Sequence, residues 1–127
     1  MTSPEGLSPQ ECWRLLSRAR MGRIALHNNG GIDIFPINFV ATREQIFFRS
    51  APGSKLINIA ANPVVAFEAD GRRTGHRWSV VVKGTAHRLD RDDEIEKSGV
   101  VRLHTETSPE KWNYVCIAPT SITGRRI

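Results

Sequence analysis

Residues 22–41 read GRIALHNNGGIDIFPINFVA, and this stretch decides the fold. Apolar side chains alternate with others over residues 22–28, which is the period of two that predicts a β-strand. The NNGG sequence at residues 28–31 suits a tight turn, because asparagine and glycine tolerate positive φ. A second strand is predicted over residues 32–41. The stretch therefore predicts an antiparallel β-hairpin.

The second predicted strand carries apolar side chains on both faces. Ile32 and Ile34 lie on one face. Phe35, Ile37 and Phe39 lie on the other. A strand with two apolar faces is covered on both sides. We therefore expect a covering layer against each face of this strand.

The segment before the hairpin predicts a helix over residues 8–19. Ser8 and Glu11 form an S-x-x-E capping box, and Pro9 occupies the first helical position, where a missing N–H costs nothing. Apolar residues then recur at the spacing of one helix face. We expect this face to pack against the sheet.

The rest of the chain predicts short strands with little helix between them. The predicted strands cover residues 46–50, 64–69, 78–88, 112–118 and 120–125. The predicted helices cover residues 54–61 and 90–98, and residues 100–111 are irregular or weakly helical. A turn covers residues 42–45, and a polar loop covers residues 70–77. Pro36 and Gly84 mark edges or bulges, and Pro119 separates the last two strands. The pattern predicts one mainly β domain over residues 1–127. We expect an antiparallel, Greek-key split β-barrel of about six or seven strands with a few short flanking helices.

Composition and charge narrow the class of partner. The 127 residues fit one domain, and no apolar run approaches the ~20 residues of a membrane span. We read no signal peptide and expect a cytoplasmic protein. The net charge of +5 permits an anionic partner, such as nucleic acid, a nucleotide or a phosphorylated cofactor. Because the basic residues are dispersed, we expect a nucleotide or phosphorylated cofactor rather than nucleic acid. Two distant cysteines and four scattered histidines show no metal-ligand spacing, so we expect no bound metal.

The segment with the clearest chemistry is FFRSAPGSKL at residues 47–56. It combines a strand end, a glycine-containing loop and a helix start, whose unpaired N–H groups attract anions. Arg49, Ser50, Ser54 and Lys55 add charged and hydroxyl donors, and together they predict a phosphate site. The alternative explanation is that Ser54 only caps the helix and the two cations are surface charges. In either case, we expect Lys55 to be exposed at the helix start.

Taken in order, a series of segments resembles the pyridoxamine 5′-phosphate oxidase-like, FMN-binding split-barrel family, specifically its short actinobacterial-type members. The segments are ECWRLL, MGRIAL, FPINFV, FFRSAPGSKL, VAFEAD, WSVVVKG and TGRRI, and the resemblance covers residues 7–127.

The resemblance implies an FMN site assembled from separate strands. It implies flavin-ring contacts at Pro36, Ile37 and Asn38, phosphate contacts at Arg49, Ser50, Ser54 and Lys55, further contacts at Trp78, Ser79 and Val80, and a substrate side at Trp112 and Arg125. In some members, the Trp78 region comes from the other subunit. Trp78 is also explained as an ordinary core aromatic, and Asn38 as a turn residue.

The implied activity is hydride transfer at the flavin N5 position, from a reduced nicotinamide or a small substrate. The sequence offers no Ser-His-Asp, Cys-His or paired-carboxylate arrangement, so we name no catalytic residue. The C-terminal Arg/His motif of true pyridoxamine 5′-phosphate oxidases is absent, and we do not expect that activity. The alternatives are a deazaflavin-dependent reductase of the same fold and a non-enzymatic flavin-binding sensor. Some relatives bind haem.

A homodimer with the flavin at the subunit interface is expected on size grounds. A small barrel fills its interior with side chains, so a three-ring cofactor lies outside it. One short chain has few elements left to cover the ring, and a second copy related by a two-fold axis supplies the missing wall.

Overall fold

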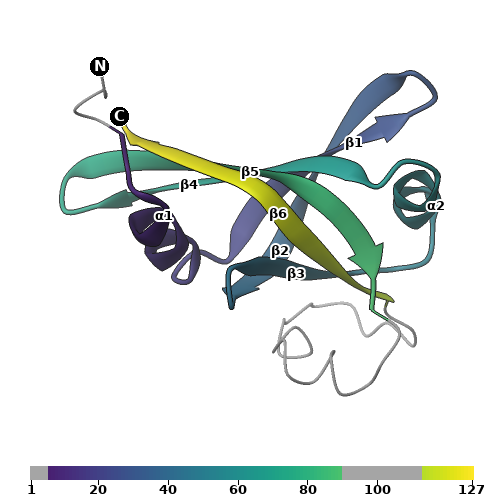
Figure 1. The fold of residues 1–127 in the computed structure, drawn as a ribbon, viewed down its shortest axis with the longest axis horizontal. Helices are drawn as coiled ribbons and strands as arrows, with labels where there is room; N and C mark the ends of the chain where they lie inside the picture. The colour runs from purple at the N-terminus through teal and green to yellow at the C-terminus, as the bar shows by residue number, and fades with distance from the viewer. Residues whose placement is uncertain (1–5, 90–112) are drawn as a thin grey trace.

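The computed structural model describes residues 6–89 and 113–127 (Figure 1). Its elements are α1 (Pro9–Leu16), β1 (Met21–Asn28), β2 (Gly31–Thr42), β3 (Gln45–Ser50), α2 (Ser54–Ala61), β4 (Val64–Arg73), β5 (His76–Arg88) and β6 (Asn113–Arg126). The strands close a barrel in the order β1-β2-β3-β6-β5-β4, and every pairing is antiparallel. The structure confirms the predicted mainly β split barrel. The predicted helix at 90–98 and the irregular segment at 100–111 lie outside the described residues.

The first predicted hairpin is present, and it gives the barrel its split form. Asn29 and Gly30 take positive φ values of 49° and 82° in the turn between β1 and β2. All of β2 up to Asn38 pairs with β1, whereas only Phe39–Thr42 pair with β3. The hairpin therefore extends from the barrel as an arm (Figure 1). Pro36 lies in the part of β2 that no described strand pairs on its second side, as an edge position requires.

The two faces of β2 differ in burial. Ile37 is only 6% exposed and Phe39 is also buried, and Phe39 packs edge-to-face on Phe67 in the main core. Ile32 and Ile34 are 67% and 66% exposed. The expectation that both faces are covered is therefore wrong for the single chain, because nothing described packs over the outer half of the arm.

Helix α1 begins as predicted and docks on β6. The Ser8 Oγ accepts a hydrogen bond from the Glu11 N–H at 3.2 Å, and the Glu11 carboxylate accepts one from the Ser8 N–H at 3.4 Å. The regular helix stops at Leu16, short of the predicted residue 19. Cys12 is fully buried beneath it, and a Cβ added at Gly124 of β6 would lie 2.6 Å from its Sγ. Glycine at 124 therefore lets the helix approach the sheet.

Two predictions about the strands are also wrong. The predicted polar loop at 70–77 is a hairpin, since β4 and β5 continue to Arg73 and from His76 around a turn at Thr74 and Gly75. These strand ends extend past the barrel core, so their side chains are polar. The two predicted last strands form the single strand β6, because Pro119 lies opposite Gly84 at a bulge in the pairing with β5. The missing N–H of proline falls where the ladder is already irregular, and the predicted bulge at Gly84 is confirmed.

Neither described helix is long and apolar enough to cross a membrane. Among the described residues, no three of the side chains of His, Cys, Asp and Glu gather as metal ligands would. The two cysteine thiols are both buried, Cys12 under α1 and Cys116 in β6. Cys116 packs with Phe47 and Leu89 in a second, smaller apolar cluster.

Candidate functional site

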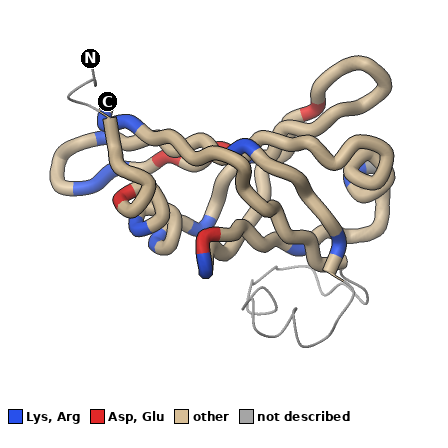
Figure 2. Tube along the Cα trace, viewed as in Figure 1, with Lys and Arg blue, Asp and Glu red and all other residues tan. Residues whose placement is uncertain are grey.

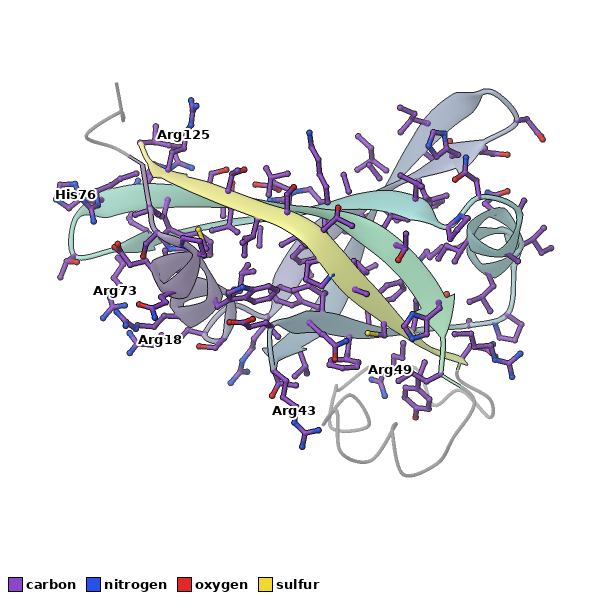
Figure 3. The ribbon with its side chains drawn as sticks, viewed as in Figure 1. Arg18, Arg43, Arg49, Arg73, His76 and Arg125 are labelled. Atoms are coloured by element: carbon purple, nitrogen blue, oxygen red, sulfur yellow. The ribbon has the colours of Figure 1, made fainter. Side chains whose placement is uncertain are left out.

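The end of β3 carries the first two predicted phosphate residues. Arg49 and Ser50 lie opposite Tyr114 and Asn113 of β6. Consecutive strand residues point to opposite faces. Ser50 is buried, and its hydroxyl donates to the Ala51 carbonyl at 3.1 Å. Arg49 is half-buried at the lower edge of the barrel in Figure 3. The two side chains therefore do not converge, in contrast to the prediction from their spacing.

The start of α2 is open to an anion. Its N-cap is Gly53, which makes no side-chain capping bond, and the first turn contains no acidic residue. The alternative that Ser54 is the N-cap is therefore wrong, because Ser54 is already inside the helix. Backbone N–H groups at such a helix start carry a partial positive charge.

Lys55 links this helix start to the arm. Its Nζ lies 5.0 Å from the centroid of the Phe35 ring on β2, which is a cation–π distance. The residue is half-buried, so the expectation that it is exposed is wrong. Burial lowers the pKa of Lys55 from its ordinary value. A cation held partly out of water gains from an anion beside it.

The predicted ring-contact residues immediately follow Phe35. Pro36 and Asn38 are exposed, and the Ile37 side chain is in the core. Among the described strands, only β1 pairs with this part of β2, and its second backbone edge could face a flat ligand. Lys55 therefore contacts the residue that immediately precedes the Pro36–Asn38 edge.

The remaining predicted contacts lie at the other end of the molecule. Trp78 and Val80 are buried, at 8% and 0% exposed, and Ser79 between them is half-exposed. These residues lie near the start of β5, next to the β4–β5 turn. Helix α2 lies at the opposite end of the barrel (Figure 1). Within one chain, the predicted site residues thus form two separate groups.

The predicted substrate-side residues are only partly described. Trp112 lies outside the described residues. Arg125 is exposed opposite Ser79, on the face turned away from α1 (Figure 3). Its neighbour Arg126 points the other way and lines a pocket against α1, where its Nη2 lies 3.9 Å from the Glu11 carboxylate.

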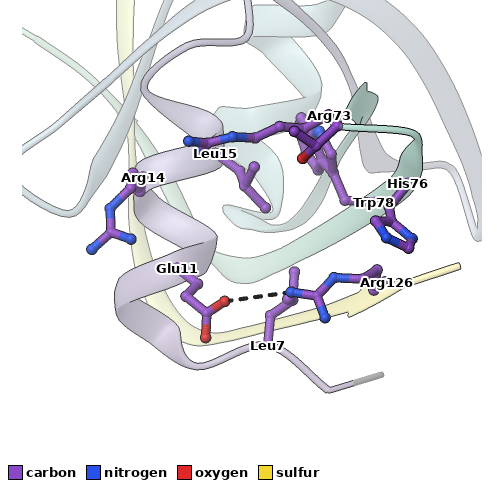
Figure 4. Close-up of a pocket in the computed structure, with 9 residues that line it drawn as sticks. Leu7, Glu11, Arg14, Leu15, Arg73, His76, Trp78 and Arg126 are labelled. Carbon is purple, nitrogen blue, oxygen red and sulfur yellow. Dashed lines mark ion pairs between the residues drawn. The ribbon is translucent and has the colours of Figure 1, made fainter. Parts of the chain in front are cut away.

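Sequence reasoning missed the two pockets beside α1. One has a volume of about 440 Å³ and the other about 420 Å³, and both are lined by Leu15, Arg73 and Trp78. We call the two together the α1 groove; Figure 4 shows the first pocket. The basic pairs Arg72-Arg73 and Arg125-Arg126 are visible in the sequence. Only the fold brings Arg72, Arg73 and Arg126 beside Arg14 of α1 and the two arginines that follow the helix, Arg18 and Arg20.

The closed antiparallel barrel and its projecting β1–β2 arm define a small split-barrel protein. The sequence profile of the pyridoxamine 5′-phosphate oxidase family matches residues 8–126, and the chain belongs to this family.

Similar solved structures include an FAD-binding protein of Mycobacterium smegmatis, which is 37% identical, with 96% of this chain and 97% of that chain covered and a TM-score of 0.81. A protein of Corynebacterium glutamicum is 38% identical, with 96% of each chain covered and a TM-score of 0.84. An uncharacterized protein of Mycobacterium tuberculosis is 38% identical over 80 residues, which are 63% of this chain and 73% of that protein.

Proposed function

We propose that this chain is a cytoplasmic, flavin-binding oxidoreductase-type protein that holds FMN with its phosphate at the start of α2 and its ring along β2. The observation that carries the proposal is the position of Lys55, half-buried and 5.0 Å from the ring of Phe35. Phe35 directly precedes Pro36–Asn38, whose second edge pairs with no described strand. The similar Mycobacterium smegmatis protein binds FAD, which supports a flavin ligand for this chain.

The residues at this end fit a flavin phosphate in two respects. The uncapped start of α2 offers backbone N–H donors, and Lys55 offers a cation whose burial disfavours its charge in the absence of an anion. FMN and FAD share the riboflavin 5′-phosphate unit, so both would use this end. Our proposal for the chain is FMN.

The bound flavin would supply hydride transfer at its N5 position. The residues of the chain bind and orient it. Lys55 neutralises the phosphate, the β2 edge offers backbone donors and acceptors to the polar rim of the ring, and Phe35 limits the access of water to Lys55. We assign no described residue as an acid or base in the reaction, whose substrate is a small molecule.

The proposal includes a homodimer with the flavin at the subunit interface. Two observations support it. The Lys55 group and the Trp78–Val80 group lie at opposite ends of one chain, so one ligand contacts both only if a second copy contributes one of them. Ile32 and Ile34 also present an uncovered apolar face on the arm. A two-fold dimer would bring the two groups of site residues together and would cover the apolar face of the arm.

The test is a fluorescence titration of the purified apo-protein with FMN and with riboflavin, after absorbance and mass analysis of any ligand that copurifies. We expect FMN to bind at least about tenfold more tightly, because one charge-assisted hydrogen bond to the phosphate is worth about 1.5–3 kcal/mol. Equal affinities would overturn the phosphate assignment. A colourless protein that binds an added deazaflavin but not FMN would identify the deazaflavin-dependent alternative.

A further inference from the structure

The α1 groove is a concave surface that shares only Trp78 with the proposed flavin site. Its two pockets meet at Leu15, Arg73 and Trp78, and each has the volume of a small-molecule site. It lies at the α1 end of the barrel, away from Lys55 and α2 (Figure 1). A ligand that fills both pockets is elongated and passes Arg73 at its middle.

Charge in the groove is strongly positive. Arg14, Arg73 and Arg126 line one pocket, and Arg18, Arg20 and Arg72 line the other. In Figure 2, basic residues mark both α1 and the β4–β5 hairpin. The excess positive charge selects an anionic ligand.

The two carboxylates that line the groove leave most of this charge in place, because only Glu11 pairs with a groove arginine. The Glu11 carboxylate faces Arg126 at 3.9 Å, and the Asp70 carboxylate is bound by Arg23 of β1 at 3.0 Å. Within residues 6–89 and 113–127, neither Arg72 nor Arg73 forms an ion pair with a carboxylate. Their guanidinium groups therefore have donors to offer a ligand.

The groove also offers an apolar surface. The Trp78 ring and the Leu15 side chain contribute to both pockets. Arg73 reaches from the end of β4 across to α1 above Leu15 (Figure 4). A planar guanidinium fork binds phosphate oxygens two at a time. Phosphates at Arg73 would thus lie directly beside a surface suited to a base or a ribose.

We propose that the α1 groove binds the adenosine diphosphate unit of a dinucleotide, with the diphosphate on Arg73 and its neighbouring arginines and the nucleoside against Leu15 and Trp78. Several separate arginines match the several charges of a diphosphate better than those of a single carboxylate. Two sources carry this unit, FAD and a nicotinamide dinucleotide. The proposal rests on the proposed function only for the choice between these two.

The test is a calorimetric titration with ADP, AMP and adenosine at low salt. We expect ADP to bind once per chain and adenosine to bind at least about tenfold more weakly, because it lacks the charged groups. The Arg73→Asn variant should bind ADP about tenfold more weakly. Arg43→Asn is the matched control, since Arg43 lies outside the groove in the β2–β3 turn with a φ of 54°, a conformation that asparagine tolerates. It should change ADP affinity less than about twofold.

The results separate the proposal from its rivals. Absence of ADP binding to the wild type overturns it, as does equal weakening by the two variants. A single-stranded oligonucleotide that binds where ADP does not would make the groove a nucleic-acid surface, which also overturns it. ADP is titrated without flavin, so a failure of the flavin proposal leaves this result interpretable.

The source of the unit follows from two further titrations. If it belongs to FAD, Arg73→Asn weakens FAD binding but not FMN binding. If it belongs to a nicotinamide dinucleotide, the variant weakens NADPH or NADH binding and leaves the ratio of FAD to FMN affinity unchanged. Either pattern, together with the weakened ADP binding of Arg73→Asn, supports the groove assignment.

Discussion

The indole ring of Trp78 lies against Gly71, its cross-strand partner on β4. A Cβ added at Gly71 would lie 2.8 Å from Cζ2 and 2.9 Å from Cε2 of the ring. The ring therefore occupies the space that any other residue at 71 would fill. This contact fixes the surface of Trp78 that both pockets of the α1 groove share.

Gly71→Ala should destabilise the protein by about 1–3 kcal/mol, because an extra methyl group forces the ring from its position. The measurement is urea denaturation followed by circular dichroism. In the Gly71→Ala background, Trp78→Phe should cost less than it does alone, since a smaller ring leaves room for the methyl group. Additive effects of the two changes would contradict the contact.

Lys55→Ala should weaken FMN binding about tenfold and leave riboflavin binding unchanged, because riboflavin has no phosphate for the lysine to neutralise. Fluorescence titration of both ligands measures the effect. Lys83→Ala removes the same charge from an exposed position of β5 and should change neither affinity. If Lys55→Ala binds FMN as tightly as the wild type, Lys55 serves only to join α2 to Phe35.

The pH dependence of FMN binding should follow Lys55. Burial lowers its pKa below the ordinary 10.5 in the free protein, so the lysine loses its charge earlier than usual as the pH rises, and FMN affinity should fall. In the same window, below 10.5 and above the lowered pKa, the unfolded chain binds more protons than the folded one. The stability of the free protein should therefore increase with pH there. Titrations of Lys55→Arg, whose side chain stays charged, should show a weaker decline in FMN affinity.

The dimer should depend on the exposed face of the arm. Light scattering of the wild type at micromolar concentration should give about twice the chain mass of 14.2 kDa. Ile34→Glu places a charge on that face and should shift the protein towards monomer with loss of FMN binding. Gln10→Glu, an exposed change on α1, is the control and should leave the dimer intact. A wild-type monomer that retains FMN would contradict an interface site.

Local patterns predicted those parts of the fold that local chemistry determines. The NNGG turn, the Ser8–Glu11 capping box and the bulge at Gly84 all occur where expected. The ends of β4 and β5 could not be predicted, because strands that extend beyond a core carry polar side chains on both faces and resemble a loop. The continuity of β6 through Pro119 depends on a bulge in the neighbouring strand, which the local pattern at Pro119 does not reveal.

The candidate site was harder to predict than the fold for a related reason. The spacing along the chain predicted that Arg49, Ser50 and Lys55 converge. In the structure, Arg49 and Ser50 point to opposite faces of β3, because strand residues alternate. Lys55 instead lies against the ring of Phe35. The α1 groove combines arginines from α1, the segment between α1 and β1, β4 and β6. Side chains that meet only through tertiary pairing leave no periodic signal in the sequence.

The two buried thiols can report local and global unfolding of the protein through the rates at which they are labelled. Burial raises the pKa of Cys12, with a further contribution from the Glu11 carboxylate, so the reactive thiolate is scarce while α1 is docked. Cys116 sits in a strand bonded on both sides, opposite Phe47 and His87. A thiol reagent should therefore label Cys12 when α1 detaches, and the rate of this labelling should depend little on urea concentration. Cys116 should be labelled only when the barrel unfolds, and its labelling rate should show the full urea dependence of unfolding. Mass spectrometry of each cysteine peptide would read the two rates separately in the unmodified sequence.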